Sequence, residues 1–287
     1  MKGIVLAGGT GSRLWPVTRS VSKQLLPIYD KPMIYYPIST LMLAGIREIL
    51  IITTPQDQHL FLQLLGDGSN FGVEFTYATQ VEPKGLAQAL TIGEEFLAGK
   101  PCLMILGDNI FYGVGLGRDL ARSIPNSGAH IFTYEVYNPS DYGVLELDEM
   151  GNAKSITEKP VKFLSNFAIT GLYFFDENVC DLARMVTPSV RGELEITSIL
   201  NSYLEAKMLS FTHLSRGSVW LDAGNPQSLS DAGVYMRVIE ERTGLKIGCI
   251  EEIALTNGWI SNDQILALCR LYGTSSYSSY LHRLVSK

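Results

Sequence analysis

The chain has 287 residues, 46% of them hydrophobic, which is enough for a substantial core in one large domain or in one domain with an appendage. A formal net charge of -6 argues against a nucleic acid or an anionic membrane surface as partner, because both attract basic faces. The four cysteines are far apart and form no CxxC pair, so the sequence predicts neither a disulfide framework nor a zinc site.

The amino terminus has one lysine and then enters a strand, without the apolar segment and cleavage site of a signal peptide. No apolar run approaches the ~20 residues that a membrane span needs. We therefore expect a cytoplasmic protein with no membrane partner.

Strand-like and helix-like segments alternate through the first half of the chain, which favours a largely parallel sheet with helices on its faces. The expected strands are residues 2–6, 48–53, 73–78 and 101–106. The expected helices are residues 33–44, 56–65, 86–97 and 116–123.

After Gly128 the spacing changes, and antiparallel pairs are expected, so the sheet should be mixed. The expected strands are residues 129–137, 143–147 and 168–175, with a further strand ending near Leu221. The expected helices are residues 177–185, 193–205, 226–241, 250–257, 263–271 and 276–285. We divide the chain into a core domain, residues 1–243, and a small helical extension, residues 244–287, that packs on it.

The segment LAGGTGSRLWPVTRSVSKQLLP, residues 6–27, leaves the carboxyl end of the first expected strand, where open α/β sheets bind their ligands. Gly8, Gly9 and Gly11 lack a Cβ, so backbone amides can approach an anion closely. Arg13 can form paired hydrogen bonds with phosphate oxygens, and Lys23 can add a point charge. The segment predicts a phosphate cradle with a nucleoside triphosphate as its ligand.

Two common glycine-rich loops compete with this interpretation, and spacing argues against both. A Walker A loop ends in Gly-Lys-Ser/Thr, which is missing here. A dinucleotide fingerprint starting at Gly9 needs a third glycine where Leu14 stands, and its acidic residue, Asp30, ends a run broken by Pro27. From the loop alone, a tight turn with incidental surface cations stays open as an alternative.

Two aspartates follow expected strands and could serve a metal site. Asp108 comes directly after the apolar run CLMILG, on the same edge of the sheet as the glycine-rich segment, and Asp222 follows a later strand. Magnesium prefers one or two carboxylates together with phosphate oxygens and water. Each aspartate alone also fits a turn at a strand end. Together on one edge they predict a magnesium site.

Residues of the second half could recognise a sugar phosphate. Glu158 can accept hydrogen bonds from sugar hydroxyls and Lys159 can pair with a phosphate, although both also fit an ordinary charged turn. Arg191 can meet an anion, or its segment simply begins a helix. Tyr142 and Tyr173 can stack against a pyranose, although an aromatic residue on a strand is usually part of the core.

The pattern of possible nucleophiles favours direct displacement. The histidines lie outside these loops, and the chain has no GxSxG, Ser-Lys or Cys-His arrangement for a covalent intermediate. A phosphate monoester is already anionic at neutral pH and needs no general base. Such a reaction needs in-line placement and cancellation of charge, which arginine, lysine and magnesium provide.

Taken together, these segments resemble the sugar-1-phosphate nucleotidylyltransferases, and closely the glucose-1-phosphate thymidylyltransferases. The resemblance covers almost the whole chain, in the order LAGGTGSRL, SKQLLP, YDKPMIYYP, EPKGLAQAL, LGDNIFYG, EKP, TGLYFFD, RGELEIT and WLDAG. It implies a Rossmann-like α/β nucleotidyltransferase core with a mixed, mostly parallel sheet, usually in a homotetramer. It also implies dTTP and glucose 1-phosphate as substrates, dTDP-glucose and pyrophosphate as products, Mg2+ as cofactor, and the first step of dTDP-rhamnose synthesis.

The resemblance assigns residues by position. The implied catalytic residues are Arg13, Lys23 and Lys159, and Gln24, Gln80 and Gly85 are implied to frame the thymine. The implied nucleotide-binding residues are Leu6, Gly8, Gly9, Thr10, Gly11, Ser12, Arg13, Lys23, Gln24, Gln80, Pro83, Gly85 and Asp108. The implied sugar-phosphate-binding residues are Asn109, Tyr142, Gly143, Glu158, Lys159, Ile169, Tyr173, Arg191 and Trp220. The implied magnesium ligands are Asp108 and Asp222.

A second nucleotide site between subunits is also implied, with dTDP-rhamnose as a feedback effector. Its corresponding residues are Tyr112, Gly113, Arg216, Glu252, Ile253 and Thr256. Relatives commonly carry arginine at the position of Thr256, so we expect weak inhibition here.

The sequence leaves three rival functions to weigh against this resemblance. A hydride-transferring dinucleotide enzyme is disfavoured by the broken fingerprint. A sister enzyme that uses UTP, CTP or ATP is the nearest alternative. A regulatory relative without catalysis would usually have lost Arg13, Lys23 or Asp108, and all three are present.

Overall fold

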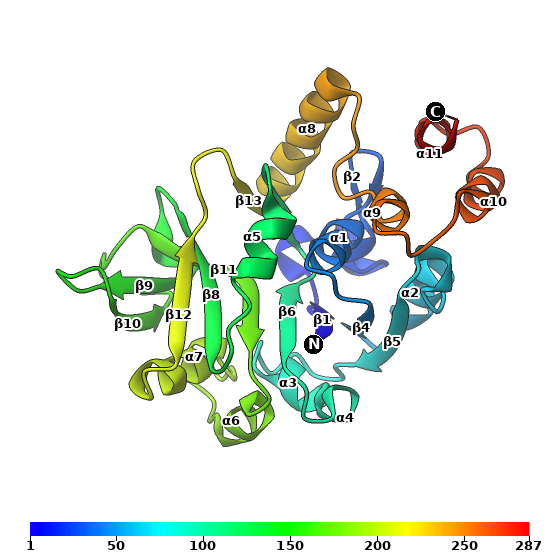
Figure 1. Cartoon of the computed structure of the whole chain (residues 1–287). Coiled ribbons are helices and arrows are strands. Elements are labelled where there is room, and N and C mark those ends of the chain that lie inside the picture. Colours follow the sequence, from blue (N-terminus) through cyan, green and yellow to red (C-terminus); the bar gives the residue numbers. More distant parts are fainter. Residues whose placement is uncertain (287) are drawn as a thin grey trace.

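A mixed sheet forms the centre of the computed structural model, which describes residues 1–286 (Figure 1). The strand order is β10-β9-β11-β6-β1-β4-β5, while β8 pairs with β11 and β12 pairs with β8. These strands are β1 (Lys2–Ala7), β4 (Glu48–Thr53), β5 (Glu74–Thr79), β6 (Cys102–Leu106), β8 (Ala129–Glu135), β9 (Gly143–Leu147), β10 (Ala153–Glu158), β11 (Phe167–Phe175) and β12 (Leu209–His213). The predicted mixed α/β sheet is confirmed.

The strands β6, β1, β4 and β5 are parallel neighbours, and their apolar sequences follow from burial on both faces. In β1, Val5 and Ala7 join one hydrophobic cluster, whereas Ile4 and Leu6 join the cluster on the opposite face. Because side chains alternate along a strand, both faces of this part of the sheet are core. The carboxyl ends of these strands lie at one edge, and the cavity described below lies there.

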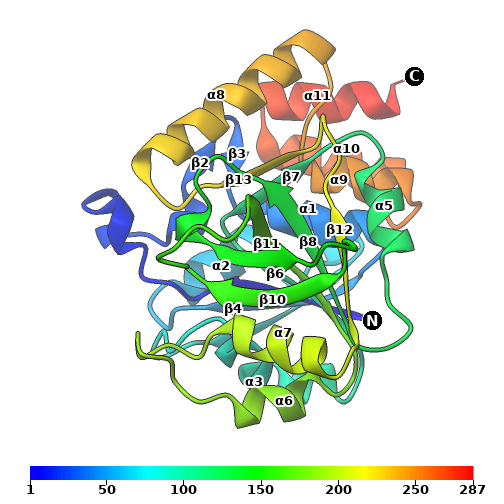
Figure 2. The same ribbon diagram turned by 90° about the vertical axis from the view of Figure 1, so that its left-hand side faces the viewer.

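Helices cover both faces of the sheet (Figure 2). One layer comprises α3 (Gln88–Ile92), α4 (Glu94–Leu97), α6 (Val179–Met185) and α7 (Ile196–Glu205). The opposite face carries α1 (Tyr35–Leu43), α2 (Gln58–Leu65), α5 (Leu116–Arg122), α9 (Ile250–Thr256), α10 (Asn262–Tyr272) and α11 (Ser276–Val285). The long helix α8 (Pro226–Thr243) packs beside the ribbon of β2 (Pro27–Ile28) and β3 (Lys31–Pro32).

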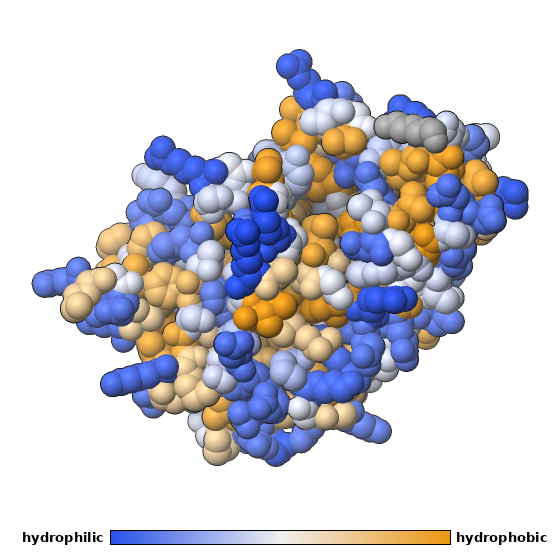
Figure 3. Space-filling model, viewed as in Figure 1, coloured by the Kyte–Doolittle hydropathy of each residue, from blue (hydrophilic) through white to orange (hydrophobic). Residues whose placement is uncertain are grey.

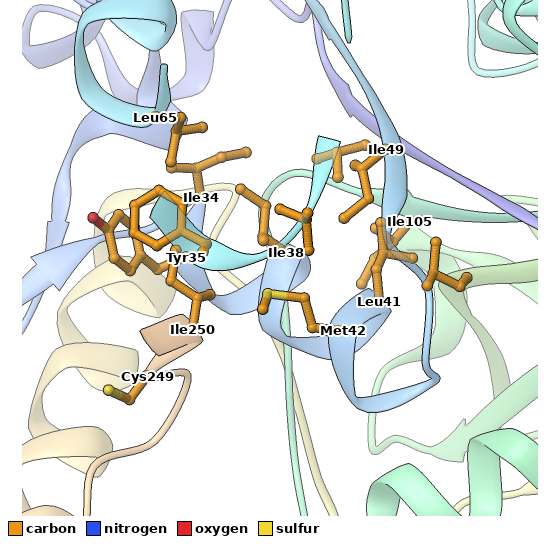
Figure 4. Close-up of a cluster of buried hydrophobic side chains, with 14 of the residues drawn as sticks. Ile34, Tyr35, Ile38, Leu41, Met42, Ile49, Leu65, Ile105, Cys249 and Ile250 are labelled. Atoms are coloured by element: carbon orange, nitrogen blue, oxygen red, sulfur yellow. The ribbon is translucent and has the colours of Figure 1, made fainter. Parts of the chain in front are cut away.

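The three C-terminal helices share a hydrophobic cluster with α1. Figure 4 shows Ile250, the first residue of α9, beside Tyr35 of α1, with Cys249 directly before it in the chain. Further buried residues of α10 and α11, among them Leu281, belong to the same cluster. The predicted helices of this region are confirmed, and the division of the chain at residue 243 stays a prediction.

Several expected elements differ from the observed ones. The helix expected over residues 86–97 is two short helices, because Gly93 interrupts it. The helix expected from residue 193 begins only at Ile196, because the backbone of Leu194 is bonded to Lys84 and Ala87 instead. The local sequence did not predict the strands β2, β3, β7 (Asn109–Tyr112), β10 and β12, which are brief or lie at sheet edges.

A buried cluster of four charged residues, the closed charge cluster, joins the β2–β3 ribbon to the end of α8 and the segment that follows. Lys31 Nζ lies 2.6 Å from Asp30 Oδ1 and 2.9 Å from Glu240 Oε1. Lys246 pairs with Asp30 and lies 2.8 Å from Glu240 Oε2. The side chains of Lys31 and Glu240 are only 2% and 3% exposed. Each cation therefore meets two carboxylates away from water.

The surface mixes polar and apolar residues. On the face shown in Figure 3, hydrophilic residues project around the outline and hydrophobic residues gather over the C-terminal helices. Within residues 1–286, no helix combines the length and the apolar composition needed to cross a bilayer.

Candidate active site

A cavity of about 670 Å³ opens at the carboxyl ends of β1, β5 and β6. Its volume suits a small-molecule ligand. Predicted residues that line it are Leu6, Gly9, Thr10, Gly11, Ser12, Arg13, Lys23, Gln24, Gln80, Pro83, Gly85, Asp108, Asn109, Tyr142, Gly143, Glu158, Lys159, Ile169, Tyr173, Arg191, Trp220 and Asp222. The structure thus brings the two halves of the predicted site together at one edge of the sheet.

The glycine-rich loop follows β1 and ends in a 3-10 helix, Ser12–Leu14, which carries the exposed Arg13. Gly11 has a φ of 62°, and its carbonyl accepts hydrogen bonds from Leu14 N at 2.9 Å and from Thr18 Oγ1 at 2.7 Å. Gly8 does not line the cavity. A Cβ on Gly8 would lie 2.4 Å from Gln80 Oε1, so glycine is required there for the approach of Gln80.

Two buried glutamines face the cavity with opposite free groups. Gln24 Oε1 accepts a hydrogen bond from Ser22 Oγ at 2.6 Å, which leaves the Nε2 donor of Gln24 free. Gln80 Nε2 donates to Gln88 Oε1 at 2.8 Å and to Gly85 O at 3.4 Å, so within residues 1–286 the Oε1 atom is the acceptor of this amide that these bonds leave free. The cavity therefore presents one amide donor and one amide acceptor to a ligand.

Asp108 and Asp222 are neighbours because β7 pairs with β13 (Val219–Asp222). In this ribbon Asp222 stands opposite Asn109, and Ala223 N donates to the backbone oxygen of Asp108 at 3.1 Å. The Asp108 carboxylate forms an ion pair with Lys23. Two carboxylates from separate segments thus lie beside the cation of the N-terminal segment.

The two aspartates differ in their protonation equilibria. Burial, together with the charge of Asp108, raises the pKa of Asp222 to about 6. Burial also raises the pKa of Asp108, but the opposing charge and hydrogen bond of Lys23 outweigh this effect, so the pKa of Asp108 is lowered. Asp222 is therefore the carboxylate whose charge is poorly compensated by the protein.

Arg13 is close to this pair. At Gly224, a Cβ would lie 3.0 Å from Asp222 Oδ1 and 3.2 Å from Arg13 Nη2, so glycine leaves room between the carboxylate and the guanidinium. Two carboxylates whose negative charge the protein compensates only in part are suitable ligands for a divalent cation that also binds phosphate oxygens. The donor set of Asp108 and Asp222 is therefore suited to Mg2+.

The far end of the cavity carries a second group of charges. Arg191 Nη1 lies 3.5 Å from Glu158 Oε1 and 3.4 Å from Glu195 Oε1. Burial and the charge of Glu195 raise the pKa of Glu158. Lys159 has a φ of 42°, which is strained for a residue with a Cβ, and its N–H donates to Tyr142 O at 2.9 Å. Acceptors and cations therefore line this end of the cavity together.

Comparison with known proteins identifies the family. The family described as Nucleotidyl transferase matches this chain over residues 2–237. The chain belongs to the nucleotidyl transferase family. Within it, the chain groups with glucose-1-phosphate thymidylyltransferases. Those of Neisseria meningitidis and Mycobacterium tuberculosis are each 50% identical over 100% of both chains. That of Mycolicibacterium smegmatis is 52% identical over 100% of both.

Solved structures agree with this placement. A Bacillus anthracis protein assigned as a glucose-1-phosphate thymidylyltransferase, in complex with a sucrose, is 39% identical with a TM-score of 0.76. The match covers 83% of this chain and 95% of that one. A UDP-glucose pyrophosphorylase complexed with UDP-glucose has a TM-score of 0.74 at 24% identity, covering 83% and 98% of the two chains, which is a likeness of fold. The predicted Rossmann-like nucleotidyltransferase core is confirmed.

This nucleotidyl transferase also lines its cavity with residues that the sequence analysis did not assign to a site. They are Leu86, Leu106, Asp141, Gly171, Glu193, Glu195, Ile196, Thr197 and Gly224. One signal was available, because a glycine inside an apolar strand often marks a close approach, as Gly171 does in β11. Glu195 and Thr197 gave no such signal, since they adjoin the start of a helix.

The residues of the implied second nucleotide site lie elsewhere. None of the six, all within the described residues, lines the cavity. Tyr112 ends β7, and Gly113 follows it beside Ser218, which also forms a β-bridge with Arg216. The other three, Glu252, Ile253 and Thr256, are on α9. Their roles stay predictions.

Proposed function

We propose that this nucleotidyltransferase transfers a thymidylyl group from dTTP to glucose 1-phosphate and releases pyrophosphate. The observation that carries the proposal is full-length identity of 50% or more to proteins named for this reaction, together with a cavity that gathers the matching residues. The assigned roles of those residues belong to the proposal.

The two glutamines support the choice of base. Thymine and uracil present an N3–H donor beside a carbonyl acceptor, which complements the free Gln80 Oε1 and the free Gln24 Nε2. Cytosine presents an acceptor at N3, so it would leave Gln80 Oε1 facing a lone pair. A site that is built for hydrogen bonding rejects a mismatched ligand strongly. An imide base is therefore favoured over cytosine.

We propose that Asp108 and Asp222 hold Mg2+ together with phosphate oxygens of the nucleotide. When bound, the ion would supply Lewis-acid stabilisation of charge on the phosphates. Asp222 gains most from such a partner, because its pKa is raised by burial and by the neighbouring carboxylate.

The protein's own residues account for the rest of the mechanism. The amides of the glycine-rich loop and Arg13 orient the triphosphate, and Lys159 with Arg191 orients the sugar phosphate. A phosphate oxygen of glucose 1-phosphate then attacks the α-phosphorus in line, the bond to pyrophosphate breaks, and no proton must be removed from the nucleophile. Arg13 stabilises the charge that develops on the leaving pyrophosphate.

The test is pyrophosphate release by purified protein with Mg2+, glucose 1-phosphate and each of dTTP, UTP, CTP and ATP. We expect dTTP to react fastest and UTP next. Fastest turnover of CTP or ATP would indicate a sister enzyme. Binding of dTTP with no release of pyrophosphate would indicate a regulatory relative.

We further propose that the protein is a cytoplasmic homotetramer that acts in dTDP-rhamnose synthesis. We also propose that it is subject to feedback regulation. Thr256 is exposed at the end of α9 and carries no charge, whereas the family resemblance implies an arginine at this position. A charge-assisted hydrogen bond is worth roughly 1.5 to 3 kcal/mol, so its loss weakens effector binding by about one to two orders of magnitude. We expect Thr256→Arg to strengthen inhibition by dTDP-rhamnose. Tight inhibition that this substitution leaves unchanged would contradict the role of Thr256.

A further inference from the structure

Asn109 makes hydrogen bonds to several parts of the site at once. It is 2% exposed and begins β7, directly after Asp108. Its Oδ1 accepts from Trp220 Nε1 at 2.6 Å and from Gly171 N at 3.1 Å. Its Nδ2 donates to Asp108 Oδ1 at 3.0 Å. The side chain thus joins β13 and β11 to the carboxylate of Asp108.

The chemistry of these partners fixes the orientation of the Asn109 amide. An indole N–H and a backbone N–H can only donate, so the amide oxygen must face Trp220 and Gly171. The NH2 group is then turned toward Asp108. Because Lys23 pairs with the other carboxylate oxygen, Asp108 Oδ2, both oxygens of Asp108 are held by donors.

An irregularity in β11 supplies one of the two donors. The register between β11 and β8 shifts between Ile169 and Tyr173, and Gly171 N donates to Asn109 in this interval. A Cβ on Gly171 would lie 2.7 Å from Asn109 Oδ1. Such irregularities often redirect groups beside active sites, and only glycine allows this approach.

We propose that Asn109 is a positioning residue for Asp108, with its amide locked by Trp220 and Gly171. This inference rests on the proposed function, in which Asp108 faces the metal and the triphosphate. Asn109 and Lys23 hold opposite oxygens of the carboxylate. Without Asn109, the carboxylate is free to turn toward Lys23, so both the carboxylate and the cation are withdrawn from the ligand.

The arrangement also limits what Asn109 can offer to a sugar. Its oxygen already accepts two hydrogen bonds, and one N–H is directed at Asp108. The remaining N–H is its only free group, so a contact with a sugar hydroxyl uses Asn109 as a donor. Nucleotide binding in the absence of sugar therefore separates the positioning role from the sugar contact.

The first test is Asn109→Leu, which keeps the size of the side chain and removes its polar groups. Calorimetric binding of dTTP with Mg2+, without sugar, should weaken by at most about 10- to 100-fold, because the energy of one hydrogen bond to a charged group is the upper limit of what positioning contributes. The Mg2+ concentration for half-maximal binding should rise. Unchanged nucleotide binding, with only the KM for glucose 1-phosphate raised, would overturn the positioning role.

The second test uses Trp220→Phe, which removes the indole N–H and keeps an aromatic ring. We expect dTTP binding to weaken by about two- to tenfold, since a neutral hydrogen bond is weaker. In the Asn109→Leu background, Trp220→Phe should have no further effect on dTTP binding, because the bond is already lost. An equal effect in both backgrounds would contradict the proposal.

The matched control is Trp259→Phe, because Trp259 packs against Arg47 outside the cavity, and binding of dTTP should not change. Thermal unfolding shows whether each variant is folded, and Trp220→Phe carries the test if Asn109→Leu does not fold. Absence of dTTP binding by the wild-type protein would contradict the proposed function. Wild-type binding that neither variant weakens would contradict the positioning role alone.

Discussion

The protein gathers opposite charges away from bulk water in two places, and the two differ in how far the charges compensate one another. In the closed charge cluster, Lys31 and Lys246 each meet both Asp30 and Glu240. In the cavity, Lys23 pairs with Asp108, while the pKa of Asp222 is raised because its charge is poorly compensated. Complete compensation fits a structural role, and incomplete compensation fits a site that awaits a charged ligand.

The largest expected effect is on kcat and comes from a substitution in the cavity. Arg13→Ala should lower kcat by roughly a hundred- to a thousandfold, because one preorganised electrostatic contact to a developing charge is worth about that much. Stability should change little, since Arg13 is exposed. Steady-state kinetics and thermal unfolding measure the two effects. Arg19→Ala, in the next turn, is the control with normal kcat, and near-normal kcat in Arg13→Ala would contradict the role.

The closed charge cluster should show the opposite pattern. Lys31→Met leaves two buried carboxylates with one cation, and removing one partner of a buried pair costs about 3 to 5 kcal/mol. We expect urea unfolding to show this loss while kcat of the folded protein stays within about threefold. Lys154→Met breaks an exposed pair with Glu146 and should cost less than about 1 kcal/mol. A large fall in kcat with unchanged stability would show that the cluster serves catalysis.

Asp222→Asn should stabilise the ligand-free protein in a pH-dependent way and at the same time impair its activity. The folded pKa of about 6 exceeds the ordinary value of 3.8, so ionisation of this carboxylate opposes folding increasingly from about pH 4 and fully above about pH 6. Removing that charge should stabilise the ligand-free protein by on the order of 1 to 3 kcal/mol at pH 7.5. The gain should shrink from pH 6 and disappear below about pH 4.

The measurement for this substitution is thermal unfolding between pH 4 and pH 8, with the Mg2+ dependence of turnover measured in parallel. An amide is a poorer ligand for a hard cation, so the Mg2+ requirement should rise. Asp231→Asn, on the exposed side of α8, should change neither quantity. Destabilisation by Asp222→Asn at high pH would show that the charge is satisfied in the folded state.

The smallest expected effect concerns the sugar-phosphate end. Lys159→Ala should raise the KM for glucose 1-phosphate by about tenfold and the KM for dTTP much less, because a charge-assisted contact to one substrate is lost. Lys159→Gly should bind as poorly but unfold at higher temperature, since glycine relieves the positive φ of 42°. Lys162→Ala, in the same exposed loop, is the control. Equal changes in both KM values would contradict the assignment.

The sequence predicted the parallel strands and the glycine-rich loop because both have strong local signals. Residues 3–7 and 101–106 are continuous runs without a charged residue, as burial on both faces requires. The edge strand β10 was missed because AKSITE is polar and half exposed. Local patterns also could not reveal that Asn109 contacts Gly171, since 62 residues separate them and only the irregular register of β11 brings them together.

The order in which the cavity residues occur along the chain has a consequence during synthesis. Its lining begins at Leu6 and ends at Gly224, and every predicted nucleotide-binding residue lies within the first 108 residues, whereas Asp222, a predicted magnesium ligand, comes much later. A ribosome therefore exposes the phosphate loop long before β13 brings the second carboxylate to the site. A nascent or truncated chain that ends before Asp222 contains the glycine-rich loop and Asp108 but lacks the second carboxylate. If the proposed roles of Asp108 and Asp222 hold, the site is complete only when almost the whole core has been made.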